Sequence, residues 1–262
     1  MSVEPREKSF KFAFTATDGV EIRYSMFGAP TPTPVVLHHG FAADTKTNWI
    51  ATGILSALVE AGHCVVSVDA RGHGRSDKPR DPALYGEEAM ARDLRQLFDR
   101  VGSASYHLVG YSMGAVVSLL VAASDGRVRR LVLGGIGAGA VELGGVDTRV
   151  LPSEAVVHAL ETEDPRTIVN ELASGFRAFA DAVGADRPAL AAQARAMHQA
   201  PIAFERITAQ TLLLVGAEDP LAVRPEVLQA VIRDARIQPL GGDHMSAIVD
   251  PRFKQTLIEF LA

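Results

Sequence analysis

A serine flanked by glycines is the clearest chemical feature of this sequence. The segment GYSMG, residues 110–114, follows a short apolar run at 106–109 and precedes an apolar stretch of helical composition at 115–123. At a sharp turn from a strand into a helix, a serine hydroxyl is held exposed, and small neighbours allow the backbone to bend. The spacing therefore predicts that Ser112 is a nucleophile for acyl transfer.

A serine hydroxyl needs a base to take its proton, and the base needs an acid to orient it. Of the eight histidines, only His244 follows the last expected parallel strands, in a loop before the final helix. For the acid, Glu218 and Asp219 compete at the end of an apolar run. We favour Asp219, because a shorter side chain suits a rigid bond to the imidazole. Asp243 is expected to shape its loop instead.

Acyl transfer also needs donors for the negative charge that develops on the carbonyl oxygen. The expected strand at 35–38 runs into the turn HGF, residues 39–41. The backbone N–H groups of Phe41 and Met113 are predicted to form an oxyanion hole, each worth about 3 kcal/mol in the transition state.

The elements that must position these groups alternate along the chain. A hairpin is expected first, at residues 10–14 and 21–26, and its phenylalanines alternate as in a half-buried strand. Further apolar runs predict strands at 35–38, 64–68, 106–109, 128–133, 212–215 and 236–240. Helical patterns lie at 49–60, 87–101, 113–123, 225–233 and 253–261. This alternation predicts an α/β fold, a parallel sheet with helices on both faces and ligands at the carboxyl ends of its strands.

One segment interrupts the alternation. Residues 136–203 contain no strand-like run and are rich in alanine, with four prolines as punctuation. We expect a helical cap that roofs the site, inserted into a core formed by residues 1–135 and 204–262. The substrate pocket is predicted to be lined by His39, Gly40, Phe41, Trp49, Met113, Phe176, Phe179, Met197 and Phe204.

Composition restricts the partners. The net charge is −5 with a pI near 5.9, which argues against nucleic acid or an anionic membrane as the main partner. The single cysteine, Cys64, excludes an intrachain disulfide, and no cluster of ligating residues predicts a metal. The first eight residues lack the apolar stretch of a signal peptide. A cytoplasmic enzyme with a small-molecule substrate is expected, with no membrane association, as a monomer or homodimer.

Three motifs together resemble the α/β-hydrolase family over nearly the whole length. HGF at 39–41 is similar to its oxyanion motif, DARGHGRS at 69–76 to its D-x-R-G-x-G-x-S turn, and GYSMG at 110–114 to its nucleophile elbow. Asp219 and His244 fall where the family places the other two members of its catalytic triad. The resemblance implies an eight-stranded, mostly parallel sheet with a helical cap after the sixth strand. Family branches that use an aspartate where Ser112 stands, the haloalkane dehalogenases and epoxide hydrolases, are excluded.

The leading hypothesis is a cofactor-independent serine hydrolase acting on a small to medium, largely apolar ester or lactone through an acyl-enzyme. A C–C hydrolase or a perhydrolase-like enzyme can use the same triad. A carboxylate-bearing C–C substrate calls for an arginine near the pocket, and Arg177 and Arg195 are the candidates. A receptor that retains the triad but turns over slowly is a third hypothesis. A glycine-rich run at 135–140 lacks the helix and acid of a nucleotide site.

Overall fold

The computed structural model describes residues 9–262, and these form one sheet of eight strands. The strands, in chain order, are β1 (Phe10–Thr15), β2 (Glu21–Phe27), β3 (Val35–His38), β4 (Val65–Asp69), β5 (Tyr106–Tyr111), β6 (Val128–Gly134), β7 (Gln210–Gly216) and β8 (Ala235–Leu240). Their spatial order is β1-β2-β4-β3-β5-β6-β7-β8. The pairs β1–β2 and β2–β4 are antiparallel and the others are parallel, which confirms the predicted fold class. The prediction about a signal peptide concerns residues 1–8, outside the described part.

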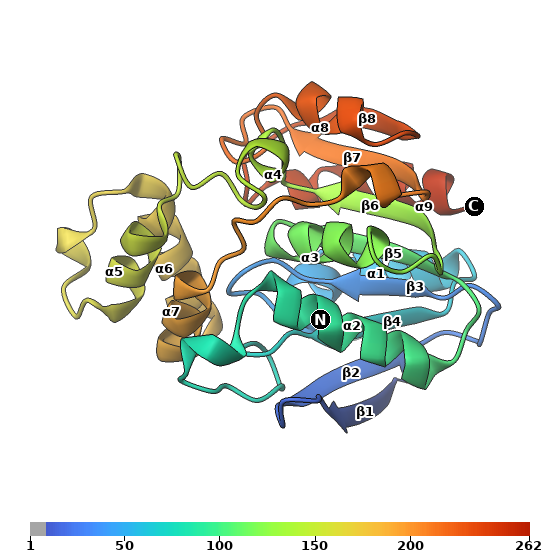
Figure 1. Cartoon of the computed structure of the whole chain (residues 1–262), viewed down its shortest axis with the longest axis horizontal. Helices are drawn as coiled ribbons and strands as arrows, with labels where there is room; N and C mark the ends of the chain where they lie inside the picture. Colours follow the sequence, from blue (N-terminus) through green and yellow to red (C-terminus); the bar gives the residue numbers. More distant parts are fainter. Residues whose placement is uncertain (1–8) are drawn as a thin grey trace, which may run out of the picture.

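Helices cover both faces of this sheet, as Figure 1 shows. One face carries α2 (Glu87–Val101), α3 (Met113–Ala122) and α8 (Pro225–Val231), and the other carries α1 (Ile54–Glu60) and α9 (Pro251–Leu261). Neighbouring strand residues alternate between the two resulting cores: Val36 belongs to the first, and Val35 and Leu37 to the second. Because both faces are buried, the parallel strands read as continuous apolar runs rather than as alternating patterns.

The edge strand β1 is more exposed than its sequence predicts. Phe14 is buried, but Phe10 and Phe12 are 61% and 40% exposed. All three side chains share one face of the strand. The guanidinium of Arg100, at the end of α2, covers Phe14 and lies 5.0 Å from its ring centroid. Phe12 stacks on Tyr24 of the neighbouring strand, with ring centroids 5.2 Å apart, and stays partly exposed. The prediction of a half-buried strand was therefore wrong for its first half.

The first predicted helix is divided in two. A six-residue π-helical turn, Thr45–Ile50, precedes α1, and the two are separated at Gly53, where φ is 72°. Asp44 caps the π-helical turn by accepting from the backbone N–H of Thr47 at 2.7 Å. The break matters because the turn lies beside the serine and presents Asn48 to it.

Four helices occupy the chain between β6 and β7. These are α4 (Gly139–Glu142), α5 (Ser153–Glu161), α6 (Glu171–Val183) and α7 (Arg187–Arg195). Figure 1 shows α5, α6 and α7 grouped beyond one end of the sheet. They have an apolar core of their own, which also includes Ala42 and Leu221 from loops of the sheet domain. We call α5 to α7 the cap helices; the division at 136 and 203 stays a prediction.

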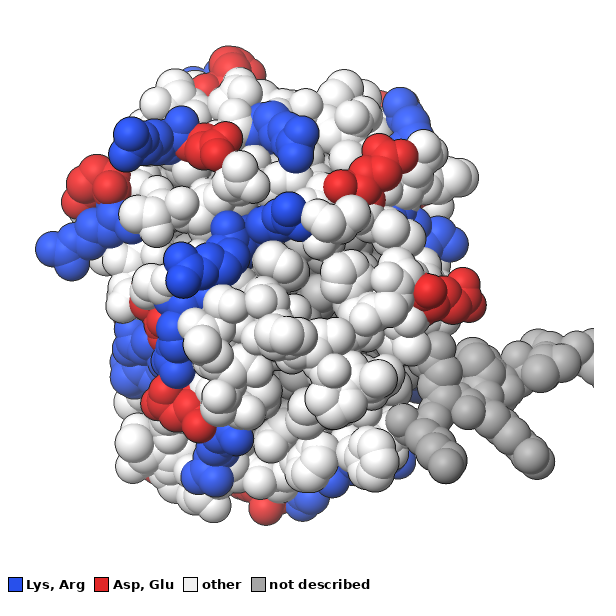
Figure 2. All heavy atoms as spheres, turned by 90° about the vertical axis from the view of Figure 1, so that its right-hand side faces the viewer, with Lys and Arg blue, Asp and Glu red and all other residues white. Residues whose placement is uncertain are grey.

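The surface charges are mixed. Figure 2 shows the face opposite the cap helices, where basic and acidic side chains lie near one another around a broad uncharged area. Ion pairs such as Arg127 with Asp99 and Asp125 join neighbours of opposite sign. Among residues 9–262, no helix is both long enough and apolar enough to cross a bilayer. The expectations about nucleic acid, membranes, oligomeric state and a cytoplasmic location remain predictions.

Candidate active site

Ser112 occupies a strained turn between β5 and α3. Its φ of 54° and ψ of −118° lie in a region that a non-glycine residue rarely adopts. A Cβ atom on Gly110 would collide with the carbonyl oxygen of Gly114, and one on Gly114 with that of His38. The two glycines are therefore required because backbone segments pack directly against the turn, which holds the serine side chain at the carboxyl end of the sheet.

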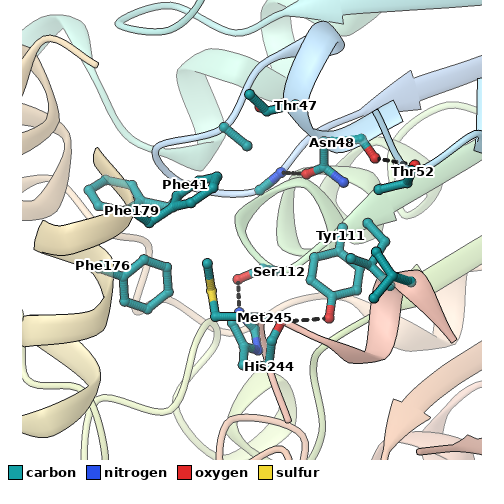
Figure 3. A pocket seen from close by; sticks show the side chains of 14 residues that line it. Phe41, Thr47, Asn48, Thr52, Tyr111, Ser112, Phe176, Phe179, His244 and Met245 are labelled. Carbon is teal, nitrogen blue, oxygen red and sulfur yellow. Dashed lines mark hydrogen bonds between the residues drawn. The ribbon is translucent and has the colours of Figure 1, made fainter. Parts of the chain in front are cut away.

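Three side chains from distant parts of the chain form a continuous hydrogen-bonded line. The hydroxyl of Ser112 lies 2.9 Å from Nε2 of His244, as Figure 3 shows, and Nδ1 of the same ring lies 2.9 Å from Oδ2 of Asp219. In the tautomer that satisfies both bonds, Nδ1–H donates to Asp219 and Nε2 accepts from the serine. All three residues are at least 95% buried. This arrangement can pass a proton from the serine to a fixed imidazole.

The structure also separates the competing acids. Glu218 is exposed, whereas Asp219 is buried and uses its second oxygen to accept from the N–H of Leu221 at 2.9 Å. Asp243 accepts from the hydroxyl and N–H of Ser246 and thereby shapes its own loop. Only Asp219 of the three carboxylates is placed against the imidazole of His244.

Two backbone donors near Ser112 are left free. Among the described residues, no hydrogen bond uses the N–H of Phe41 or of Met113. The N–H of Gly40, just before Phe41, instead donates to Oδ1 of Asn48 at 2.9 Å. Phe41 and Met113 line the same small cavity as Ser112, so the two residues predicted to supply the oxyanion donors border the serine.

Asn48 is a functional candidate that the sequence did not reveal. Its side chain fixes the turn that precedes Phe41, and its own position depends on the π-helical turn. That turn is anchored by Asp69, whose Oδ1 accepts from the N–H of Thr45 at 3.0 Å. The burial of Asp69 would raise its pKa, but hydrogen bonds from Thr45 and from the backbone N–H of Arg75 lower it below the usual value. The carboxylate therefore stays ionised and holds the turn.

Two cavities meet at Ser112. The first has a volume of about 150 Å³ and is lined by Gly40, Phe41, Ala43, Thr47, Asn48, Thr52, Tyr111, Ser112, Phe176, Phe179, His244, Met245, Ile248 and Val249. The second, of about 30 Å³, is lined by Phe41, Glu87, Ser112, Met113, Val146, Leu151, Val156, Phe176, Gln193, Met197 and Leu221. Figure 3 shows Phe41, Phe176 and Phe179 gathered on the cap side of Ser112. Phe176 also meets the His244 ring, with centroids 5.9 Å apart.

Three residues predicted to line the pocket do not do so. Trp49 is fully buried in the core beneath α1 and α9. His39 is also fully buried, donating from Nδ1 to the carbonyl of Gly40 at 2.8 Å and accepting at Nε2 from the N–H of Ala70 at 3.0 Å. Phe204 packs into the core on the α2 and α3 side. The other predicted lining residues border one or both cavities.

Three further histidines lie near the site without sharing its chemistry. Burial lowers the pKa of His38 and of His73 to about 3, and it also lowers that of His39. Their rings are therefore neutral at neutral pH. Among residues 9–262, no group of three histidine, cysteine or acidic side chains is arranged to hold a metal ion.

Comparison with known proteins places this geometry in a family. A sequence profile of the alpha/beta hydrolase fold matches residues 33–183. Epoxide hydrolase A of Mycobacterium tuberculosis is 36% identical over 101 residues, which are 38% of this chain and 30% of that protein. Esterase YbfF of Escherichia coli is 32% identical over 139 residues, 51% of this chain and 49% of that protein. The matched region thus spans less than half of either relative. A hydrolase from Pseudomonas aeruginosa superposes with a TM-score of 0.77 at 25% identity, over 96% of this chain and 98% of that one.

Proposed function

This chain belongs to the alpha/beta hydrolase fold family, and from that membership we propose that it is a serine hydrolase. Its proposed substrate is a small to medium, largely apolar carboxylic ester or lactone, which it cleaves through an acyl-enzyme. The observation that supports this most strongly is the buried line from Asp219 through His244 to Ser112, with bonds of 2.9 Å at each step. A triad is recognised by such geometry and by the roles that it permits.

In the proposed mechanism, Oγ of Ser112 attacks the ester carbonyl while Nε2 of His244 takes the hydroxyl proton. Asp219 stabilises the resulting imidazolium through its bond to Nδ1. The oxyanion accepts from the N–H groups of Phe41 and Met113. As the intermediate collapses, His244 gives its proton to the departing alcohol. Water then attacks the acyl-enzyme by the same proton route, which releases the acid and restores the serine.

The cavity walls support an apolar substrate. Aromatic and aliphatic side chains dominate the first cavity. Apart from Tyr111, Ser112 and His244, its polar lining residues are Thr47, Asn48 and Thr52, which lie along one side. With the cap helices supplying Phe176 and Phe179, a bound ester is enclosed between the cap and the sheet. An apolar enclosure excludes water and strengthens the hydrogen bonds to the oxyanion.

A C–C hydrolase of acidic substrates receives less support. Arg177 pairs with Asp181 at 2.7 Å and donates to two backbone carbonyls, and Arg195 pairs with Glu161 at 2.7 Å. Neither arginine lines a cavity at Ser112. The perhydrolase-like and receptor alternatives share the same residues, and the free oxyanion donors favour a site that turns substrate over.

The test is a panel of aryl esters, alkyl esters, lactones, thioesters and dienoic C–C substrates, run beside labelling with a fluorophosphonate probe. We expect esters or lactones to give the highest kcat/KM and the probe to label Ser112. A higher kcat/KM on the dienoic substrates would favour the C–C hydrolase. Tight ligand binding with negligible turnover of every substrate would favour the receptor.

A further inference from the structure

The second cavity has a polar end that the proposed mechanism does not use. Glu87, the first residue of α2, is buried to 97% and lines this cavity together with Gln193 of α7. The remaining lining, apart from Ser112, consists of hydrophobic side chains. Burying a carboxyl group in such surroundings costs folding free energy unless hydrogen bonds from the protein or a ligand satisfy it.

One oxygen of Glu87 is well satisfied and the other is not. Oε2 accepts from the backbone N–H of His198 at 2.6 Å. From the other residues in the described part of the chain, Oε1 receives only the side-chain amide of Gln193 at 3.5 Å, at the limit of hydrogen-bond distance. The amide oxygen of Gln193 is itself occupied, because it accepts from the N–H of Gly86 at 3.1 Å. Oε1 can therefore accept a further hydrogen bond from a group in the cavity.

Glu87 has no cationic partner among residues 9–262. Burial raises its pKa to about 7, and only backbone hydrogen bonds act against that shift. Groups with a perturbed pKa are concentrated at functional sites. Glu87 lines a cavity beside the proposed nucleophile, Ser112. These surroundings therefore suit a carboxyl group that accepts a hydrogen bond from an uncharged donor rather than one that pairs with a cation.

The two cavities differ in the groups that they offer to an ester at Ser112. His244, which must protonate the departing alcohol, lines only the first cavity, whereas Met113, a proposed oxyanion donor, lines only the second. The alcohol part therefore occupies the first cavity and the acyl part points into the second. This assignment rests on the proposed function.

The size of the second cavity limits the acyl group. Its volume of about 30 Å³ holds two or three water-sized atoms, since each needs about 10–15 Å³. We propose that Glu87 and Gln193 form the end of a subsite for a short hydroxyacyl group, with the substrate hydroxyl donating to Oε1 of Glu87. Glycolyl, lactyl and 3-hydroxypropionyl esters have substituents of this size and carry the required donor.

The experiment compares phenyl esters of glycolic, lactic and 3-hydroxypropionic acids with phenyl acetate and phenyl propionate. The measured quantity is the ratio of kcat/KM between each hydroxyacyl ester and its counterpart without the hydroxyl. We expect a ratio of at least about tenfold for one hydroxyacyl ester, the effect of one hydrogen bond to a charged or strongly polar group. Glu87→Leu should reduce this ratio to about one. Glu88→Gln is the matched control, because Glu88 is exposed in the same helical turn, and it should preserve the ratio.

A ratio near one for every hydroxyacyl ester with the wild-type enzyme would overturn the proposal and leave the cavity as a site for water only. A ratio that survives in Glu87→Leu would overturn it as well. If that variant does not fold, Glu87→Gln tests the same oxygen, because an amide is a weaker acceptor and should reduce the ratio. Failure of the proposed function looks different: no ester is hydrolysed and the fluorophosphonate does not label Ser112.

Discussion

The hydroxyl of Tyr111 donates a hydrogen bond to the backbone carbonyl of His244 at 2.8 Å. Tyr111 immediately precedes Ser112, so one side chain ties the strand that carries the proposed nucleophile to the loop that carries the proposed base. Burial raises the pKa of Tyr111 well above its usual value, which keeps the hydroxyl protonated and able to donate. The distance between Ser112 and His244 therefore depends on a contact that sequence motifs do not describe.

Tyr111→Phe should lower kcat/KM for esters by about tenfold, because a loosened base loop loses part of its positioning. The carbonyl of His244 also loses its partner, which should reduce the free energy of unfolding by about 1–3 kcal/mol. Steady-state kinetics and urea unfolding of the same preparation measure both effects. Wild-type kinetics in the variant would show that the tyrosine does not position the base.

Asn48→Ala should lower kcat by about tenfold and change KM less than that. The reason is that Gly40 loses the acceptor that fixes the turn before Phe41. Displacing a donor from the oxyanion reduces the stabilisation of the transition state rather than the binding of the substrate in the ground state. Asn48→Asp retains an oxygen at the same place and should recover most of the rate. Equal losses in both variants would argue against this positioning role.

Gly110→Ala should destabilise the protein by about 3 kcal/mol or more, because the new Cβ meets backbone atoms that cannot move aside. Gly175→Ala is the matched control. Gly175 lies within α6, where an added Cβ meets nothing within 4 Å, and helix propensity predicts a gain of about 0.5–1 kcal/mol. Chemical denaturation of the two variants should give shifts of opposite sign; a neutral effect at Gly110 would contradict the packing seen at the turn.

The titration of Glu87 should lower the free energy of unfolding as the pH rises. Its pKa is raised from 4.5 to about 7 in the folded state, so the folded state holds the proton more tightly than the unfolded state does. The stabilisation is complete below about pH 4.5 and is lost as the pH rises through about 7, with a magnitude on the order of 3 kcal/mol. Urea unfolding between pH 5 and pH 8 should therefore show a flatter profile for Glu87→Gln than for wild type.

Glu88→Gln serves as the control for this profile as well, since an exposed carboxylate should leave the pH dependence as it is in wild type. If Glu87→Gln and wild type lose the same stability between pH 5 and pH 8, the buried carboxyl does not titrate in that range.

The local motifs could be predicted because the residues that constrain the backbone lie next to one another in the sequence. Gly110 and Gly114 identify the elbow around Ser112 since only glycine fits those positions. The strand runs and the helix at 87–101 follow from periodicity and length, and the structure reproduces them closely. His244 and Asp219 could be placed because the order of βα units brings the ends of β7 and β8 to the same edge as Ser112.

The residues that were missed or misplaced depend on tertiary packing. Asn48 contacts Gly40, eight residues away, and Tyr111 contacts His244, 133 residues away, and no spacing rule indicates either contact. Glu87 resembles any acidic residue in the first turn of a helix until the cap helices bury it. Trp49 and Phe204 were assigned to the pocket by residue type, which does not distinguish a core from a cavity wall.

The most direct test of the central claim is the rate at which Ser112→Ala hydrolyses a short-chain p-nitrophenyl ester, compared with wild type. Because the mechanism begins with the hydroxyl of Ser112, removal of its oxygen should lower kcat by about 10⁶-fold while the protein remains folded. Hydrolysis at an undiminished rate by the folded Ser112→Ala protein would contradict the account.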